Sequence, residues 1–281
     1  MDLEAEETYR SVGHYVVVAQ KKVYSAVKAD GRNIKMASQP IYQFYAELKD
    51  YKPKIWRRFQ VSKNSTMARL GYIVMTMFEM QASHLFCIDV MYRRNFYQSM
   101  LKLFSAEEVE KLFPPSEIKE TYRYEVKNEM TADFDDDEAE NAVGVKLSHT
   151  VSNNGDEMVF SYDYGDGWQV AITLEKIFED KELPGKELPR VLEGEGYGII
   201  EDCGGTCGLE EMAKTFKNKR GKQYREFCEW LGIDELDLAA FDLDDMNFRL
   251  KKIPRIYANA YEFGLEPTKQ SLNLLMRKYK K

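Results

Sequence analysis

The sequence contains few cysteines and no long apolar run, and these absences exclude several classes of protein. Only 4 of the 281 residues are Cys, which is too few for a disulfide-rich extracellular scaffold and favours a reduced protein. No stretch approaches the ~20 consecutive apolar residues that a membrane span requires. Residues 1–7 are acidic, whereas a secretory signal begins basic and then becomes apolar. We therefore expect a cytoplasmic protein with no membrane partner.

Common nucleotide-binding and hydrolase motifs are also missing from the sequence. It has no P-loop, dinucleotide-binding glycine pattern, nucleophile elbow, His-Glu-x-x-His or Cys-x-x-Cys. Cys203 and Cys207 form one loose pair, but a structural zinc site needs four ligands. The sequence therefore lacks any complete set of residues for a familiar enzyme or for a structural zinc site.

The charges are segregated along an otherwise ordinary globular composition. Hydrophobic residues make up 44% and charged residues 31%, with 40 Lys and Arg against 47 Asp and Glu. A net charge of −7 repels nucleic acid, so any binding of a phosphate backbone must be local. The candidates for it are a run of cations with no acid between them: Lys214, Lys217, Lys219, Arg220, Lys222 and Arg225. The alternative is that they form the solvated faces of ordinary helices.

Periodicity predicts an α+β fold with a mainly antiparallel, twisted sheet. We expect strands at 41–48 and 54–61, at 85–91, and in a hairpin of 158–164 with 168–178 that turns at Gly165-Asp166-Gly167. Helices are predicted at 65–80, capped by Ser65, at 105–113, capped by Ser105, and at 209–219, 222–232, 242–252 and 268–279. An acidic loop at 133–140 and a glycine-rich loop at 184–208 separate them.

One helix is expected to pack on the sheet and the C-terminal helices to close another layer. We divide the chain into an N-terminal extension (1–38), an α+β domain (39–252) and a C-terminal helical tail (253–281).

Five ordered motifs carry a resemblance to a known family. They are the hairpin 42–61, Ser83-His84-Leu85, the Tyr-Asp-Tyr-Gly-Asp-Gly-Trp run 162–168, Glu201-Asp202-Cys203-Gly204-Gly205, and the helix 241–250. Together they span about three-quarters of the chain, which resembles the plasmid pRiA4b ORF-3-like family. That resemblance implies the fold and a setting on plasmids, transposons or phages, but no established chemistry.

The chain departs from the pattern of that family at several positions. The resemblance implies a His two residues after the Trp of the Gly-Asp-Gly-Trp turn and another after His-Leu, where this chain has Val170 and Phe86. Ile199-Ile200 stands in place of a Pro-Pro pair. These losses argue against a His-assisted enzyme.

Aromatic and arginine side chains suggest one candidate binding surface. Trp56, Arg57 and Arg58 on one strand and Trp168 on another could form a platform on which bases stack and guanidinium groups meet phosphates. The alternative is that the Trp side chains belong to the core and that the Arg side chains pair with carboxylates.

Carboxylates and one imidazole suggest a second candidate site. Asp163, Asp166, Glu201 and Asp202, with His84, could act catalytically in phosphodiester hydrolysis. In that case His84, Asp166, Glu201 and Asp202 are the candidate ligands for Mg²⁺ or Mn²⁺. The alternative needs no cofactor: Asp166 fixes the turn, Glu201 and Asp202 bind loop amides near the glycine pair, and His84 is structural.

Two functions follow from these observations. The first is a non-enzymatic accessory protein of a mobile element that binds a protein or nucleic-acid partner through charged and aromatic surface. One form of it is an inhibitor of host nucleic-acid machinery whose acidic surface imitates nucleic acid. The second is a metal-dependent hydrolase acting on nucleic acid, which requires the five residues of the carboxylate and His set to converge.

Overall fold

Alternating apolar side chains of two neighbouring strands build one face of the sheet. The computed structural model describes residues 40–128 and 138–275. In it β1 (Ile41–Leu48) pairs antiparallel with β2 (Trp56–Ser62), as the sequence predicts. Phe44 lies opposite Phe59, and the two rings stack with centroids 5.5 Å apart. This register directs one apolar row of each strand to the same face.

The described strands form an eight-stranded sheet in the order β5-β4-β3-β6-β7-β1-β2-β8. All neighbours are antiparallel except β4 and β5. The remaining strands are β3 (Phe86–Val90), β4 (Tyr122–Glu125), β5 (Glu140–Asn141), β6 (Glu157–Tyr162), β7 (Trp168–Phe178) and β8 (Arg190–Glu195). The prediction of an α+β fold with a mainly antiparallel sheet is therefore confirmed.

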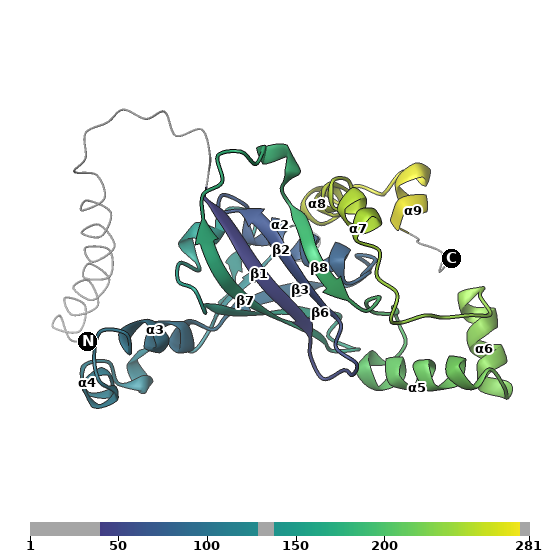
Figure 1. Ribbon diagram of the computed structural model, residues 1–281, viewed down its shortest axis with the longest axis horizontal. Coiled ribbons are helices and arrows are strands. Elements are labelled where there is room, and N and C mark those ends of the chain that lie inside the picture. The colour runs from purple at the N-terminus through teal and green to yellow at the C-terminus, as the bar shows by residue number, and fades with distance from the viewer. Residues whose placement is uncertain (1–39, 129–137, 276–281) are drawn as a thin grey trace. The chain divides into compact units, whose positions relative to one another are not determined.

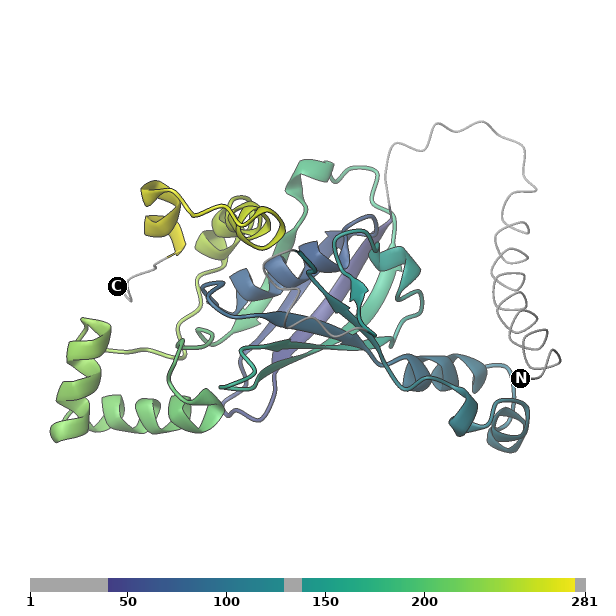
Figure 2. The ribbon, with the colours of Figure 1, turned by 180° about the vertical axis from the view of Figure 1, so that it is seen from behind.

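Helix α2 (Met67–Met77) covers one face of this sheet, as Figure 2 shows, and nearly all of its side chains are buried. The other face looks toward the viewer in Figure 1 and carries no helix of the described chain. The helix begins one residue later than predicted. Thr66, rather than Ser65, is the N-cap, and its hydroxyl accepts from the backbone N–H of Arg69 at 3.1 Å.

Two of the C-terminal helices, α7 (Leu243–Leu250) and α8 (Ile253–Phe263), pack against α2. Helix α7 contacts β8 and α2, and α8 lies along α2. Tyr257 and Tyr261 of α8 are buried in the common core. The described residues, 40–128 and 138–275, belong to one compact unit. The predicted extension 1–38 and most of the acidic run 133–140 lie outside the described residues.

The other helices lie at the periphery of the sheet. Ser105 caps α4 as predicted, with Glu108 completing a capping box. Strand β8 and helix α3 were not predicted, and β8 lies inside the glycine-rich segment that was predicted to be a loop. Helix α8 lies within the predicted helical tail 253–281, although its bounds were not predicted. None of the described helices is long and apolar enough to cross a bilayer. The bounds of the remaining helices and short 3₁₀ turns are α3 Tyr92–Met100, α4 Ala106–Leu112, α5 Gly205–Asn218, α6 Lys222–Leu231, α9 Lys269–Leu275, Pro115–Glu117, Leu147–His149 and Gly185–Glu187.

Candidate metal centre

Four of the five residues predicted for a carboxylate and His site lie together. His84 Nε2 is 3.4 Å from Asp163 Oδ2, 3.5 Å from Glu201 Oε2 and 3.3 Å from Asp202 Oδ1. One ligand atom of each residue lies within 4.8 Å of the others. These four side chains are called the His84 cluster below. No cysteine belongs to it, and Cys203 and Cys207 are free thiols.

Sheet topology brings the cluster together from three segments. His84 precedes β3 and Asp163 follows β6, and these strands are antiparallel neighbours, so both residues emerge at one end of the sheet. The backbone N–H of Asp163 extends the pairing to the carbonyl of Leu85 at 3.1 Å. Glu201 and Asp202 come from the loop between β8 and α5, which is tied to the end of α2 by Ile199 N–H donating to Phe78 O at 2.9 Å.

Glu201 is held rigidly by hydrogen-bond donors. Its side chain is 7% exposed. Its Oε1 accepts from the Tyr162 hydroxyl at 2.7 Å and from the backbone N–H of Gln81 at 2.6 Å, and its Oε2 accepts from the Ser83 hydroxyl at 3.2 Å. These donors stabilise a buried carboxylate that would otherwise be costly. Gln81 and Ser83 lie in the same segment as His84, and Tyr162 ends β6, so none of the three donors is an amide of the glycine pair.

Asp163 and Asp202 both adopt left-handed backbone conformations, with φ of 53° and 58°. Such strain in residues other than glycine is concentrated at functional sites. Asp163 Oδ1 accepts from the N–H groups of Gly165 (3.0 Å) and Asp166 (3.3 Å), so Asp163 fixes the turn and not, as predicted, Asp166. The Asp166 carboxylate instead accepts from Gly204 N–H at 3.1 Å. It braces the neighbouring loop and is not one of the four.

The donor set of the His84 cluster fits a divalent cation. Three carboxylates within a few ångströms repel one another, and the single imidazole cannot neutralise them all. Carboxylate oxygens suit Mg²⁺ and Mn²⁺, and an added imidazole favours Mn²⁺ of the two. The side chains of Asp202 and His84 are 69% and 32% exposed, so one side of the cluster faces solvent. Among the described residues, these four are the group whose geometry can hold a metal ion.

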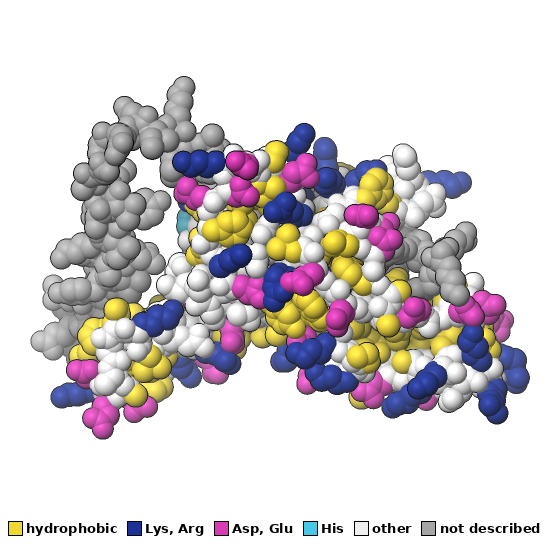
Figure 3. All heavy atoms as spheres, viewed as in Figure 1, with side chains coloured by type: hydrophobic (Ala, Val, Ile, Leu, Met, Phe, Trp, Pro, Cys, Tyr) yellow, Lys and Arg dark blue, Asp and Glu magenta, His cyan; other side chains and the backbone are white. Residues whose placement is uncertain are grey.

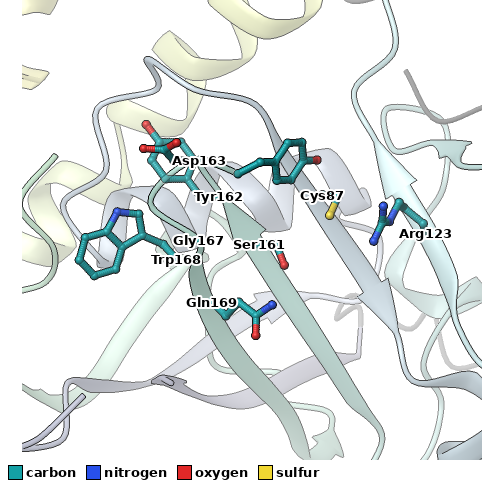
Figure 4. Close-up of a pocket in the computed structure, with 9 residues that line it drawn as sticks. Cys87, Arg123, Ser161, Tyr162, Asp163, Gly167, Trp168 and Gln169 are labelled. Carbon is teal, nitrogen blue, oxygen red and sulfur yellow. The ribbon is translucent and has the colours of Figure 1, made fainter. Parts of the chain in front are cut away.

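A hollow of about 340 Å³ adjoins the cluster at Asp163. Figure 4 shows Cys87 and Arg123 on one side of it, with Ser161 and Gln169 on another. Arg123 is paired with Asp89 at 2.9 Å. Trp168 also lines the hollow, and its indole N–H is buried with no hydrogen-bond partner in the described part of the chain.

The predicted aromatic and arginine platform is divided between the two faces of the sheet. Arg57 and Trp168 are fully buried on the face that α2 covers. Trp56 and Arg58 lie on the open face, where Trp56 stacks on Tyr45 with centroids 5.4 Å apart. Arg57 and Trp168 therefore cannot contact a partner in this structure.

Arg57 and Arg58 differ in what they bind. The Arg57 guanidinium donates to four backbone carbonyls at 2.7 to 2.9 Å, three of them in residues 195–197. It therefore anchors the loop that leads to Glu201. Arg58 pairs with Glu175 at 2.7 Å and also with Glu193. Figure 3 shows acidic and basic side chains interspersed over this open face.

The six predicted cations are all exposed on α5, α6 and their connection. Three of them form ion pairs with acids: Lys214 with Glu210, Lys219 with Glu235 and Lys222 with Glu226, at 3.4, 2.7 and 3.0 Å. The acid-free run in the sequence is therefore partly neutralised by acids before and after it. Such exposed pairs contribute little to stability.

Residues 40–247 match the family described as plasmid pRiA4b ORF-3-like protein. This chain belongs to that family. The match confirms the resemblance that the five motifs carry, and the two positions where the resemblance implies His, Phe86 and Val170, are buried in the core. Family membership thus agrees with the fold and adds no imidazole to the His84 cluster.

Two relatives extend the comparison. The chain is 32% identical over 104 residues to the uncharacterized protein y4hQ of Sinorhizobium fredii (strain NBRC 101917 / NGR234). That match covers 37% of this chain and 52% of y4hQ, so the chain spans about half the length of this curated relative. It is also similar to the crystal structure of a protein of unknown function, MM3350, from Methanosarcina mazei Go1. The TM-score is 0.57 with 26% identity, covering 74% of this chain and 97% of MM3350.

Sequence reasoning found the cluster but missed the groups that hold it. Tyr162 lies next to Asp163 in the motif 162–168, yet alternation along β6 gives no sign that its hydroxyl reaches Glu201, 39 residues away. The backbone N–H of Gln81 carries no sequence signal at all. Only the tertiary contacts identify these two donors.

Proposed function

We propose that this protein is a metal-dependent hydrolase that acts on nucleic acid, with Mg²⁺ or Mn²⁺ bound by the His84 cluster. The observation that carries the proposal is the convergence of one imidazole and three carboxylates from three separate segments. Two of the carboxylates are nearly buried, and two of the residues have strained backbones. A purely structural loop does not need this concentration of like charge.

The chain's own residues prepare the site for hydrolysis of a phosphodiester. When bound, a divalent ion polarises a phosphoryl oxygen and lowers the pKa of a coordinated water. Tyr162, Ser83 and Gln81 orient the Glu201 carboxylate, and Asp163 is oriented by the turn it closes. The exposed Asp202 leaves one side open to water and substrate.

The position of α5 supports nucleic acid as the substrate class. This helix begins at Gly205, three residues after Asp202, and carries the exposed Lys214 and Lys217. Cations along it can contact successive phosphates of a strand whose scissile group lies at the cluster. The net charge of −7 limits such contact to this region.

Metal binding and cleavage test the proposal together. Elemental analysis of the purified full-length chain and electron paramagnetic resonance (EPR) titration with Mn²⁺ measure binding. Labelled single- and double-stranded DNA and RNA, incubated with Mn²⁺ or with EDTA, measure cleavage. We expect cleavage that needs the metal and is lost in Asp163→Asn, a variant that keeps the left-handed turn. Glu175→Gln, which removes a carboxylate paired with Arg58 on the open face, is the matched control. Absence of both metal binding and cleavage would refute the proposal.

The exposed cations favour a second candidate, a non-enzymatic accessory protein of a mobile element. Lys217, Arg220 and Arg225 are exposed on α5, α6 and their connection and can bind a nucleic-acid partner directly. This function predicts salt-dependent binding that EDTA leaves unchanged and that a triple Ala variant of these residues weakens. Affinity purification followed by mass spectrometry and nucleic-acid sequencing would identify a partner, including a host enzyme that the protein inhibits. Metal-dependent cleavage would exclude this candidate.

A further inference from the structure

We infer that the helices beyond the family match, the end of α7 and α8, hold the His84 cluster in shape, and that Tyr257 and Tyr261 are positioning residues for it. The inference rests on the proposed function, because it concerns the same metal centre. The family match ends at residue 247. Arg249, Tyr257 and Tyr261 all lie after that point, and all three are buried.

These three side chains contact one short segment, residues 79–84, that runs from α2 to β3. Arg249 forms an ion pair with Glu79. The Tyr257 hydroxyl donates to the carbonyl of Met80, and the Tyr261 hydroxyl donates to the carbonyl of His84 itself. Arg249 and Tyr257 therefore bind one end of the segment that carries His84, and Tyr261 binds the other end.

The same segment supplies most of the groups that orient Glu201. Gln81 donates its backbone N–H and Ser83 its hydroxyl to that carboxylate. A shift of residues 79–84 thus moves a ligand and two ligand-orienting donors together. Groups that orient ligands in this way typically change metal affinity about 10- to 100-fold when removed.

The backbone of the segment cannot hold its shape by local preference. Glu79 and Ala82 have positive φ of 61° and 65°, a conformation that is unfavourable for residues with a side chain. Strained backbone persists only where surrounding contacts fix it. The contacts from α7 and α8 provide that constraint, together with Tyr162, whose hydroxyl accepts from Ser83 N–H at 3.2 Å.

The test compares three Tyr→Phe variants of the full-length chain. Tyr261→Phe and Tyr257→Phe each remove one hydroxyl that donates a hydrogen bond to the segment 79–84. Tyr72→Phe is the matched control: Tyr72 is equally buried and its ring stacks on Tyr261, but its hydroxyl donates to Glu262 and not to residues 79–84. All three variants keep the aromatic ring, so the core packing is retained.

Two measurements are made on each variant, the Kd for Mn²⁺ by EPR and the hydrogen exchange of residues 79–85 in the metal-free protein. We expect Tyr261→Phe to raise the Kd about 10-fold and Tyr257→Phe to raise it in the same direction. Exchange of the segment should accelerate in both. Tyr72→Phe should change the Kd less than about 2-fold, although its loss of stability is similar.

The outcomes separate this inference from the proposed function. A wild-type chain that binds Mn²⁺, with Tyr261→Phe and Tyr257→Phe binding equally well, overturns the inference alone. Equal weakening by all three variants also overturns it, because the effect is then one of general stability. A wild-type chain that binds no Mn²⁺ overturns the metal centre and the inference with it.

Discussion

Replacing Glu201 by Gln should separate metal affinity from stability. Glu201 is the most buried carboxylate of the His84 cluster and accepts three hydrogen bonds. A Gln side chain has the same shape, and its carbonyl oxygen can still accept from Tyr162 and the Gln81 N–H, while its amide can donate to the Ser83 hydroxyl. The variant therefore removes one negative charge and leaves the local packing intact.

The magnitude follows from the distance between a bound ion and the lost charge. Because the ligand atoms lie within 4.8 Å of one another, an ion among them is about 3 Å from each. At the dielectric constant of water, one unit charge about 3 Å from a divalent ion is worth about 3 kcal/mol. That free energy corresponds to a Kd about 100-fold higher, and partial burial makes the estimate a lower bound.

Stability in EDTA should move in the opposite direction. The three carboxylates repel one another in the metal-free protein, and Glu201→Gln relieves part of that repulsion. We expect the Tm of the variant in EDTA to equal or exceed that of the wild type, while the Mn²⁺ Kd from EPR titration rises at least about 100-fold. Glu175→Gln is the control and should leave the Kd unchanged. A Glu201→Gln chain that binds Mn²⁺ as tightly as the wild type would refute the reasoning.

Three further predictions concern stability and pH. Burial raises the pKa of Tyr124 to about 12 and that of Tyr162 further, so the native state keeps protons that the unfolded state loses near pH 10. The free energy of unfolding should therefore fall as pH rises above about 10, which urea titrations checked by absorbance at 295 nm would measure; a flat profile contradicts this. Burial raises the pKa of Glu175, but the hydrogen bonds from Arg58 and Gln43 and the charges of Arg58 and Lys176 together lower it more, so the net shift is downward from 4.5. Its contribution is present above pH 4.5 and is lost as pH falls further, so wild type and Glu175→Gln should converge in acid. Arg57→Met leaves four backbone carbonyls without their donor and should lower the free energy of unfolding, measured by urea denaturation, by about 3 kcal/mol or more. Arg58→Met should lower it by less than about 1 kcal/mol. Equal losses in the two variants would contradict a structural role for the four hydrogen bonds of Arg57.

Local patterns in the sequence were sufficient for most of the sheet. The alternation in 41–61 and in 158–178 is a short-range property, and it predicts strands, hairpins and the buried row. The same alternation places Arg57 on the face with Phe59 and Val61, and Arg58 on the other face. The structure confirms that division, which a reading of Trp56, Arg57 and Arg58 as one platform overlooked.

Elements with weak local signals were missed for a physical reason. Strand β8 contains Gly194 and charged residues, so its composition resembles a loop, and it becomes a strand by pairing with β2. Helix α8 lies in the segment 253–281 that was predicted to be helical, but its bounds and its packing along α2 were not predicted. For β8, a tertiary partner therefore overrides a weak local preference.

The sequence by itself determined the kinds of residue available for a site: carboxylates at Asp163, Glu201 and Asp202, and an imidazole at His84. It has too few cysteines for a disulfide-rich scaffold or a structural zinc site. It could not determine which of the candidate residues meet, because the segments are separated by up to 118 residues and no local rule relates them. The pairing of β3 with β6 and the loop after β8 bring four together and turn Asp166 aside to Gly204. Only the tertiary structure could decide that, and only it shows that the hydroxyls of the buried Tyr257 and Tyr261 donate to the carbonyls of Met80 and His84.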